Sequence, residues 1–111
     1  MAGSVIVEVV HGPLMGQVFP FSKHDTLIVG RSDSCHIALP GDPFLSRHHF
    51  SIEVIPPMAR LRDLGSLNGT YVDGTRYGGR TQGDQHEAIP QAKVLEVDLH
   101  HGYQLCERVV Q

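Results

Sequence analysis

The sequence has few of the features that mark a secreted, membrane or nucleic-acid-binding protein. Only two of its 111 residues are cysteine, too few for the disulfide framework of a small secreted domain. No apolar run is long enough for a membrane-spanning helix, and the first residues lack the basic flank of a secretory signal. Lysine and arginine gather in no segment, and the net charge is −3. We therefore expect a cytoplasmic protein that binds neither nucleic acid nor membrane.

What the chain has instead is the composition of one small β-rich domain, covering residues 1–111. Its 41 % of hydrophobic residues are enough for a single core. Short bursts of alternating apolar and β-branched residues, bounded by turn residues, are typical of strands. The expected strands are Val5–Val10, Thr26–Val29, His36–Leu39, Phe50–Ile55, Met58–Leu61, Thr70–Val72, Val94–Leu99 and Tyr103–Val110.

No segment of ten or more residues keeps a helical period, and regular short strands indicate an all-β sandwich or barrel. Within the expected strand after His49, the residues Phe50, Ile52 and Val54 fall on one face. Gly78–Gln91 has few strand signals, and we expect it to be a long loop.

Three polar segments interrupt this pattern at the ends of expected strands. They contain Arg31, then Ser46 and Arg47, then Asn68. Arginine guanidinium groups match phosphate or carboxylate oxygens in a bidentate manner. A serine hydroxyl adds a donor, and an asparagine amide both donates and accepts. Acidic and basic residues cancel between positions 31 and 70, so the expected site is a small pocket for one phosphate.

The dipeptide Asn68-Gly69 is also a strong hairpin signal, because both central residues of a type I′ turn need positive φ. We therefore expect Asn68 to form a turn as well as to bind.

The order and spacing of these motifs resemble those of the forkhead-associated (FHA) domain. The matching motifs are Gly30-Arg31, Ser46-Arg47-x-His49 and Ser66-x-Asn68-Gly69-Thr70-x-Val72-x-Gly74. The resemblance spans about residues 5–110 and is strongest from 28 to 75. It implies a sandwich of two antiparallel sheets, with about eleven short strands and with binding loops at one end. Those loops would bind phosphothreonine in a partner protein.

The resemblance also implies a role for each matching residue. Arg31 would contact the phosphate, as would Ser46 through its hydroxyl and backbone N–H, and Arg47 would support the phosphate or the nearby peptide. Asn68 would bind the peptide backbone. The framework of the site would be Gly30, His49, Gly69 and Thr70, with His49 tying the binding loops together.

The chain departs from the family pattern in two places. Asp73 stands where asparagine is usual, although Asp-Gly suits the same turn. The family also closes with Gly-Asp and two further strands. Either Gly83-Asp84 or the segment Leu99–Leu105 fills that place, and we prefer the second because apolar alternation resumes there.

Catalysis and metal binding are the competing interpretations. Eight histidines include the adjacent pairs His48-His49 and His100-His101, but neighbours on a strand point to opposite faces. Cys35 beside His36 could form a nucleophile and base, yet no third member or oxyanion hole is evident. We therefore expect no enzyme, no metal and no cofactor. The partner would be a phosphothreonine protein such as a Ser/Thr kinase or its substrate. A phospho-independent scaffold of the same fold is the alternative, and the oligomeric state stays open.

Overall fold

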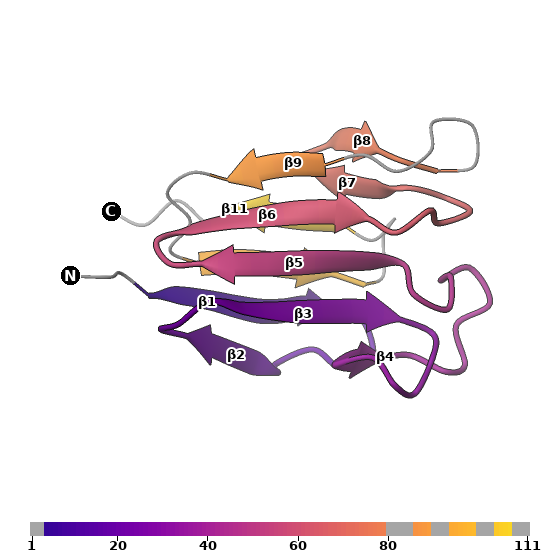
Figure 1. Ribbon diagram of the computed structural model, residues 1–111. Coiled ribbons are helices and arrows are strands. Elements are labelled where there is room, and N and C mark those ends of the chain that lie inside the picture. The colour runs from indigo at the N-terminus through magenta and orange to yellow at the C-terminus, as the bar shows by residue number, and fades with distance from the viewer. Residues whose placement is uncertain (1–3, 80–85, 90–93, 100–103, 108–111) are drawn as a thin grey trace.

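The computed structural model describes residues 4–79, 86–89, 94–99 and 104–107, and every regular element within them is a strand (Figure 1). The all-β prediction is therefore confirmed. In these residues no helix is long and apolar enough to cross a membrane. The strands are β1 (Val5–His11), β2 (Val18–Phe21), β3 (Asp25–Gly30), β4 (Ile37–Ala38), β5 (Phe50–Ile55), β6 (Met58–Asp63), β7 (Thr70–Val72), β8 (Thr75–Tyr77), β9 (His86–Ile89), β10 (Val94–Asp98) and β11 (Gln104–Glu107).

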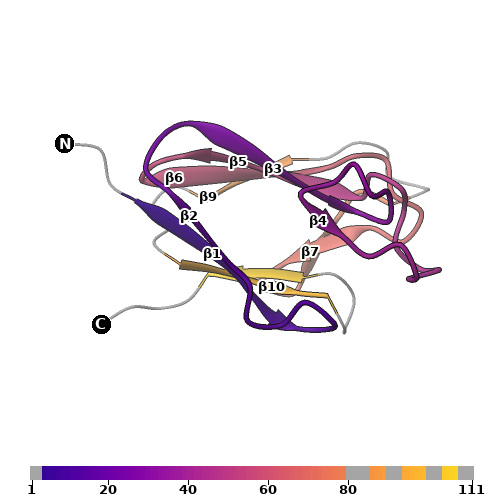
Figure 2. The ribbon, with the colours of Figure 1, turned by 90° about the horizontal axis from the view of Figure 1, so that it is seen from below.

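The strands form two sheets that face each other (Figure 2). One has the order β2-β1-β10-β11-β7-β8 and the other β4-β3-β5-β6-β9. The expected antiparallel sheets are in fact mixed, because β1 pairs with β10, β11 with β7 and β3 with β4 in parallel. Alternation along a strand shows which residues face the core, but not which distant strand will lie beside it or in which direction.

The core lies between the two sheets and is built from the inward-facing residues of each. The expected face of β5 is confirmed, because Phe50, Ile52 and Val54 are each 0 % exposed. Removing such apolar surface from water is the main stabilising term in a fold of this kind. The other fully buried core residues are Val5, Val7, Val9, Val29, Ile37, Ala59, Leu61, Leu95, Val97 and Leu105.

Three strands were not expected from the sequence, β2, β8 and β9, and each lies at an edge of its sheet. β2 contains Pro20, which an edge strand tolerates because one side of its backbone needs no partner. β9 lies inside Gly78–Gln91, so the loop prediction is wrong at His86–Ile89. There the backbone pairs with β6 from Ala59 to Arg62. Backbone hydrogen bonds need no apolar alternation, which explains why the pattern gave no signal.

The type I′ turn occurs at a different place from the one expected. β7 and β8 are joined by Asp73, with φ of 47°, and Gly74, with φ of 86°. Asp73 therefore serves the hairpin as predicted for an Asp-Gly pair. Asn68 is not among the residues with positive φ, so the hairpin predicted at Asn68-Gly69 is wrong. That segment joins β6 to β7, which lie in different sheets.

The chain closes with the strand pair β10 and β11, which run antiparallel with Leu95 opposite Glu107. β11 lies between β10 and β7 in the first sheet. This agrees with the alternation expected to resume near Leu105. Gly83-Asp84 and residues 100–103 lie outside the described residues.

Candidate functional site

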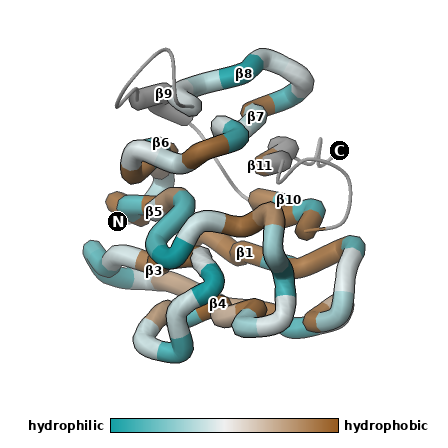
Figure 3. The backbone as a smooth tube through the Cα atoms, turned by 90° about the vertical axis from the view of Figure 1, so that its right-hand side faces the viewer, coloured by the Kyte–Doolittle hydropathy of each residue, from teal (hydrophilic) through white to brown (hydrophobic). Residues whose placement is uncertain are grey.

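Three loops meet at one end of the molecule, on the right of Figure 1 and facing the viewer in Figure 3. The first loop (residues 31–36) joins β3 to β4, and the second loop (39–49) joins β4 to β5. The third loop (64–69) joins β6 to β7. All four residues that we expected to bind a ligand lie on these loops, where a rigid sheet framework often places binding groups.

The first and second loops are joined through their backbones. The Arg31 N–H donates to the Ser46 carbonyl at 2.9 Å, and the Ser32 N–H donates to the Arg47 carbonyl at 3.0 Å. Gly30 makes this approach possible, since a Cβ at that position would lie 2.2 Å from the Arg47 carbonyl oxygen. Only glycine fits such a contact without a backbone shift. Gly30 thus allows the backbone at Arg31 to lie beside the backbone at Ser46.

His49 joins the second loop to the third. Its ring is fully buried, and its Nδ1 accepts the Ser46 N–H at 3.1 Å. Because Nδ1 accepts, Nε2 carries the proton and donates to the Gly69 carbonyl at 2.7 Å. Burial lowers the pKa of His49, partly offset by the Gly69 carbonyl and by the negative charge of Asp63. A neutral imidazole in one tautomer therefore holds the two loops together, which is the role that the resemblance to the FHA domain implies for His49.

The same hydrogen bond changes what Ser46 can offer to a ligand. Its backbone N–H, which we expected to contact phosphate, is already used by His49. The Ser46 hydroxyl oxygen accepts the Leu67 N–H at 3.0 Å. A hydroxyl has one proton to donate, and no acceptor for this proton is found among the described residues. Ser46 can thus donate to an anion through its hydroxyl alone.

The third loop folds around the buried carboxylate of Asp63, a role that we did not foresee. Asp63 Oδ1 accepts the Ser66 hydroxyl at 2.6 Å and the Thr70 hydroxyl at 2.8 Å. Its Oδ2 accepts the N–H groups of Ser66 at 3.0 Å and Gly65 at 3.1 Å. The Ser66 hydroxyl in turn accepts the Gly69 N–H at 2.9 Å. An acidic residue three positions before a serine is the sequence signal for such a turn.

Asn68 lies at the tip of this supported loop and its side chain is exposed. Its Nδ2 donates to the Phe44 carbonyl of the second loop at 2.8 Å. An amide side chain has two N–H groups and a carbonyl oxygen, so one donor and the acceptor have no partner among the described residues. The arrangement suits recognition of a peptide backbone, which offers both a donor and an acceptor.

The candidate site also contains two exposed arginines, Arg31 and Arg47. Arg31 Nε donates to the Leu45 carbonyl at 3.2 Å, which positions the guanidinium and leaves its terminal N–H groups for other partners. Neither Arg31 nor Arg47 takes part in an ion pair found among the described residues. An exposed arginine commonly pairs with a nearby carboxylate, but no ion pair of Arg31 with Asp33 or Asp42 is found among the described residues.

Cys35 and His36 lie near the site, but their geometry does not suit nucleophilic catalysis. Cys35 is 8 % exposed, and its thiol donates to the Arg47 carbonyl at 3.4 Å. Burial raises the pKa of the Cys35 thiol, which disfavours the reactive thiolate. The His36 Nδ1 is occupied in accepting the Ile28 N–H at 2.8 Å. Cys35 behaves as a small buried residue.

The family model for the FHA domain matches residues 27–87, more than half of the chain and all three loops. The chain belongs to the FHA domain family. FHA domains are in general modules that bind phosphopeptides and mediate protein–protein interaction, and they are not typically enzymes.

A solved structure gives the same assignment for the fold. This FHA domain is similar to the crystal structure of the FHA domain of CT664 protein from Chlamydia trachomatis, with a TM-score of 0.60 and 26 % sequence identity. The similarity covers 78 % of this chain and 80 % of that chain. No curated protein matches the chain significantly.

Proposed function

We propose that this FHA domain is a non-enzymatic module that binds phosphothreonine in a partner protein. The observation that supports the proposal is the convergence of Arg31, Ser46 and Asn68, from three separate loops, with donor groups left for a ligand. The loops are held by buried groups, His49 and Asp63, so the donors are positioned before a ligand arrives. Preorganised donors lose less entropy on binding.

The chemistry of each contact follows from the donor set. A phosphothreonine has a charge of about −1.5 to −2 at neutral pH and three acceptor oxygens. Arg31 and the Ser46 hydroxyl bind these oxygens, Arg47 supports the phosphate or adjacent peptide, and Asn68 binds the peptide backbone. Hydrogen bonds to charged groups contribute about 1.5–3 kcal/mol each, so a few of them give micromolar affinity, roughly −8 kcal/mol.

The framework supports the same assignment. Gly30 allows the first two loops to approach, and His49 links Ser46 to Gly69. Thr70 binds the carboxylate that shapes the third loop. The sandwich of about eleven strands expected for this family would present all of them at one end.

The partner that fits this chemistry is a protein phosphorylated on threonine, either a Ser/Thr kinase itself or a substrate of one. We place the interaction in the cytoplasm, the reducing setting that the low cysteine content favours.

Calorimetric titration with a degenerate phosphothreonine peptide library tests the proposal. Unphosphorylated and phosphoserine libraries of the same design are the controls. We expect binding to the phosphothreonine library and none to the unphosphorylated one. Failure of the folded protein to bind any of the libraries would contradict the proposal and favour a phospho-independent scaffold. Partner binding that survives Arg31→Ala and Ser46→Ala together would point to the same alternative.

A further inference from the structure

Arg76 is an exposed arginine of β8 that belongs to none of the three sequence motifs. It lies opposite Tyr71 in the pairing of β8 with β7, and β7 begins directly after the third loop. Residues two apart along a strand share a face, so Gly69, two residues before Tyr71, is a diagonal neighbour of Arg76. A long side chain at position 76 can therefore reach the third loop.

The side chain of Arg76 lies over two glycines that are distant from each other in sequence. A Cβ at Gly69 would be 2.7 Å from Arg76 Nε and 3.3 Å from its Cγ. A Cβ at Gly79 would overlap Nη2 and would be 3.1 Å from Cζ. The guanidinium thus occupies the space that a side chain at either glycine would need.

Gly69 is the residue that follows Asn68, and its backbone is held from within the protein. Its N–H donates to the Ser66 hydroxyl at 2.9 Å, and its carbonyl accepts the His49 Nε2–H at 2.7 Å. Gly69 has a φ of 85°, in a region that glycine enters and leaves more easily than other residues. Arg76 covers this buried residue, and without it water could compete for both hydrogen bonds.

The described part of the chain shows no other interaction that would explain the position of Arg76. It takes part in no ion pair found there, whereas Arg60 pairs with Glu53. β8 has three residues and lies at the edge of its sheet, where an exposed side chain contributes little to stability. Its contacts with the two glycines are thus the main local effect of this arginine.

We propose that Arg76 is a positioning residue for Asn68. By covering Gly69, it keeps the neighbouring Asn68 amide in the conformation that donates to the Phe44 carbonyl at 2.8 Å and meets the peptide backbone. Arg76 acts through Asn68 and does not itself contact the ligand. This inference rests on the proposed function, in which Asn68 binds the peptide.

A double-mutant cycle tests whether Arg76 acts through Asn68. Calorimetric titration with one phosphothreonine peptide from the library compares Arg76→Ala in the wild-type, Asn68→Ala and Arg31→Ala backgrounds. In the wild-type background we expect binding to weaken about fivefold, within the range of coupling between neighbouring residues. The same factor should appear in the Arg31→Ala background, because Arg31 lies on a different loop. In the Asn68→Ala background the substitution should have no further effect.

A measurement on the free protein gives a second readout that needs no ligand. Hydrogen exchange followed by NMR should show that the Gly69 N–H exchanges at least about threefold faster in Arg76→Ala than in the wild type. The side-chain amide resonances of Asn68 should move as well. Thr75→Ala, at the adjacent exposed position of β8, is the matched control and should change neither. Thermal unfolding verifies that each variant is folded, and Arg76→Gln replaces Arg76→Ala if the latter does not fold.

Other outcomes identify which part of the account is wrong. If Arg76→Ala binds the peptide as tightly as the wild type, the inference fails while the proposed function stands. An equal loss of affinity in the Asn68→Ala background would mean that Arg76 attracts the phosphopeptide by its charge and does not position Asn68. Unchanged exchange at Gly69 would also overturn the inference. If the folded wild type binds no phosphothreonine peptide, the proposed function fails and the role of Arg76 fails with it.

Discussion

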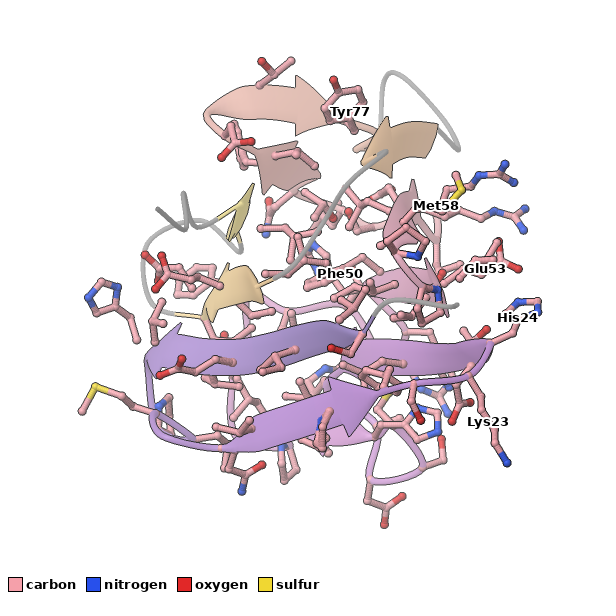
Figure 4. The ribbon with its side chains drawn as sticks, turned by 90° about the vertical axis from the view of Figure 1, so that its left-hand side faces the viewer. Lys23, His24, Phe50, Glu53, Met58 and Tyr77 are labelled. Carbon is pink, nitrogen blue, oxygen red and sulfur yellow. The ribbon has the colours of Figure 1, made fainter. Side chains whose placement is uncertain are left out.

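At the end of the molecule where β5 turns into β6, polar and charged side chains such as His24 and Glu53 pair with one another (Figure 4). His24 Nε2 lies 2.9 Å from Glu53 Oε2, and Arg60 Nη1 lies 3.9 Å from Glu53 Oε1. At the opposite end the loops are longer, and Arg31 and Arg47 form no such pair among the described residues. The connections at both ends join strands of the same two sheets.

The polar groups of the loop end are instead divided between an inner and an outer layer. Asp63 and His49 are fully buried and bind loop backbone, while Arg31, Arg47 and Asn68 are exposed. Buried polar groups that are fully hydrogen-bonded stabilise one loop conformation. The exposed donors keep capacity for a ligand. In the proposed function, the loop end thus differs from the opposite end in the state of its donor groups and not in its net charge.

Removal of the buried carboxylate should have the largest effect. Asp63→Ala leaves the hydroxyls of Ser66 and Thr70 and several N–H groups without an acceptor in a buried setting. Each unsatisfied group costs about 1–3 kcal/mol, so we expect a loss of at least about 3 kcal/mol in the free energy of unfolding. Urea denaturation measures it. Asp33→Ala, at an exposed position of the first loop, is the control and should change stability by less than about 0.5 kcal/mol. Similar losses in the two variants would contradict the role of Asp63.

A methyl group added at the junction of the first two loops should come next. Gly30→Ala places a Cβ 2.2 Å from the Arg47 carbonyl oxygen, so the loops must separate. We expect a stability loss of about 1–3 kcal/mol together with weaker phosphopeptide binding. Gly41→Ala is the matched control in the second loop, because a Cβ there meets nothing within 4 Å. If Gly30→Ala behaves like Gly41→Ala in denaturation and calorimetry, the close approach is not needed.

Substitution of one exposed arginine at each end compares the two regions most simply. Arg31→Ala should weaken phosphothreonine binding at least about tenfold, since a lost contact of roughly 1.4 kcal/mol has that effect. Arg60→Ala removes another exposed arginine, one that pairs with Glu53, and it should leave affinity unchanged. Thermal unfolding should change little in either variant. Equal affinities of Arg31→Ala and the wild type would refute the assignment of Arg31.

The contribution of His49 to the pH dependence of stability should be a small effect, because it comes from one group. Burial lowers the pKa of His49, so the unfolded chain binds more protons than the folded chain as pH falls below about 6.5. The contribution of His49 is fully present above that pH and decreases on acidification through this range. Urea denaturation at several pH values, with NMR titration of the His49 ring, measures it. A pKa of the His49 ring at or above that of a free histidine would contradict the account. It would show that His49 does not hold the loops as a neutral donor and acceptor.

Phosphopeptide affinity should fall on acidification for a separate reason. The phosphate loses its second charge near pH 6, which weakens its hydrogen bonds to Arg31 and Ser46. Calorimetry at pH 7.5 and pH 5.5 with a phosphopeptide tests this. A phosphonate analogue with a different second pKa should shift the pH midpoint of the loss of affinity in the same direction as that pKa. A midpoint that does not shift would assign the effect to a group of the protein.

The sequence predicts residues whose role is local better than residues whose role depends on distant partners. Alternation in Phe50–Ile55 is a local property, and β5 has those bounds. β9 depends on backbone pairing with β6, and His86–Ile89 has no apolar alternation to reveal it. The Asn68-Gly69 pair looked like a hairpin turn because the dipeptide is read without knowing that β6 and β7 lie in different sheets.

The site shows the same division. Residue types and the family pattern predict that Arg31, Ser46, Arg47 and Asn68 bind the ligand, and the structure brings their loops together. The sequence could not predict that the Ser46 N–H donates to His49, because this hydrogen bond depends on the orientation of a buried ring. The support given by Asp63 likewise requires the fold of the third loop to be known.

An NMR titration of the labelled protein with a phosphothreonine peptide selected from the library tests the central claim most directly. The two ends are observed in one experiment. We expect the largest amide shift changes in the three loops, at Arg31, Ser46 and Asn68, and almost none at His24 and Glu53. Shift changes centred on His24 and Glu53, or spread over the outer face of a sheet with the loops unaffected, would contradict the account.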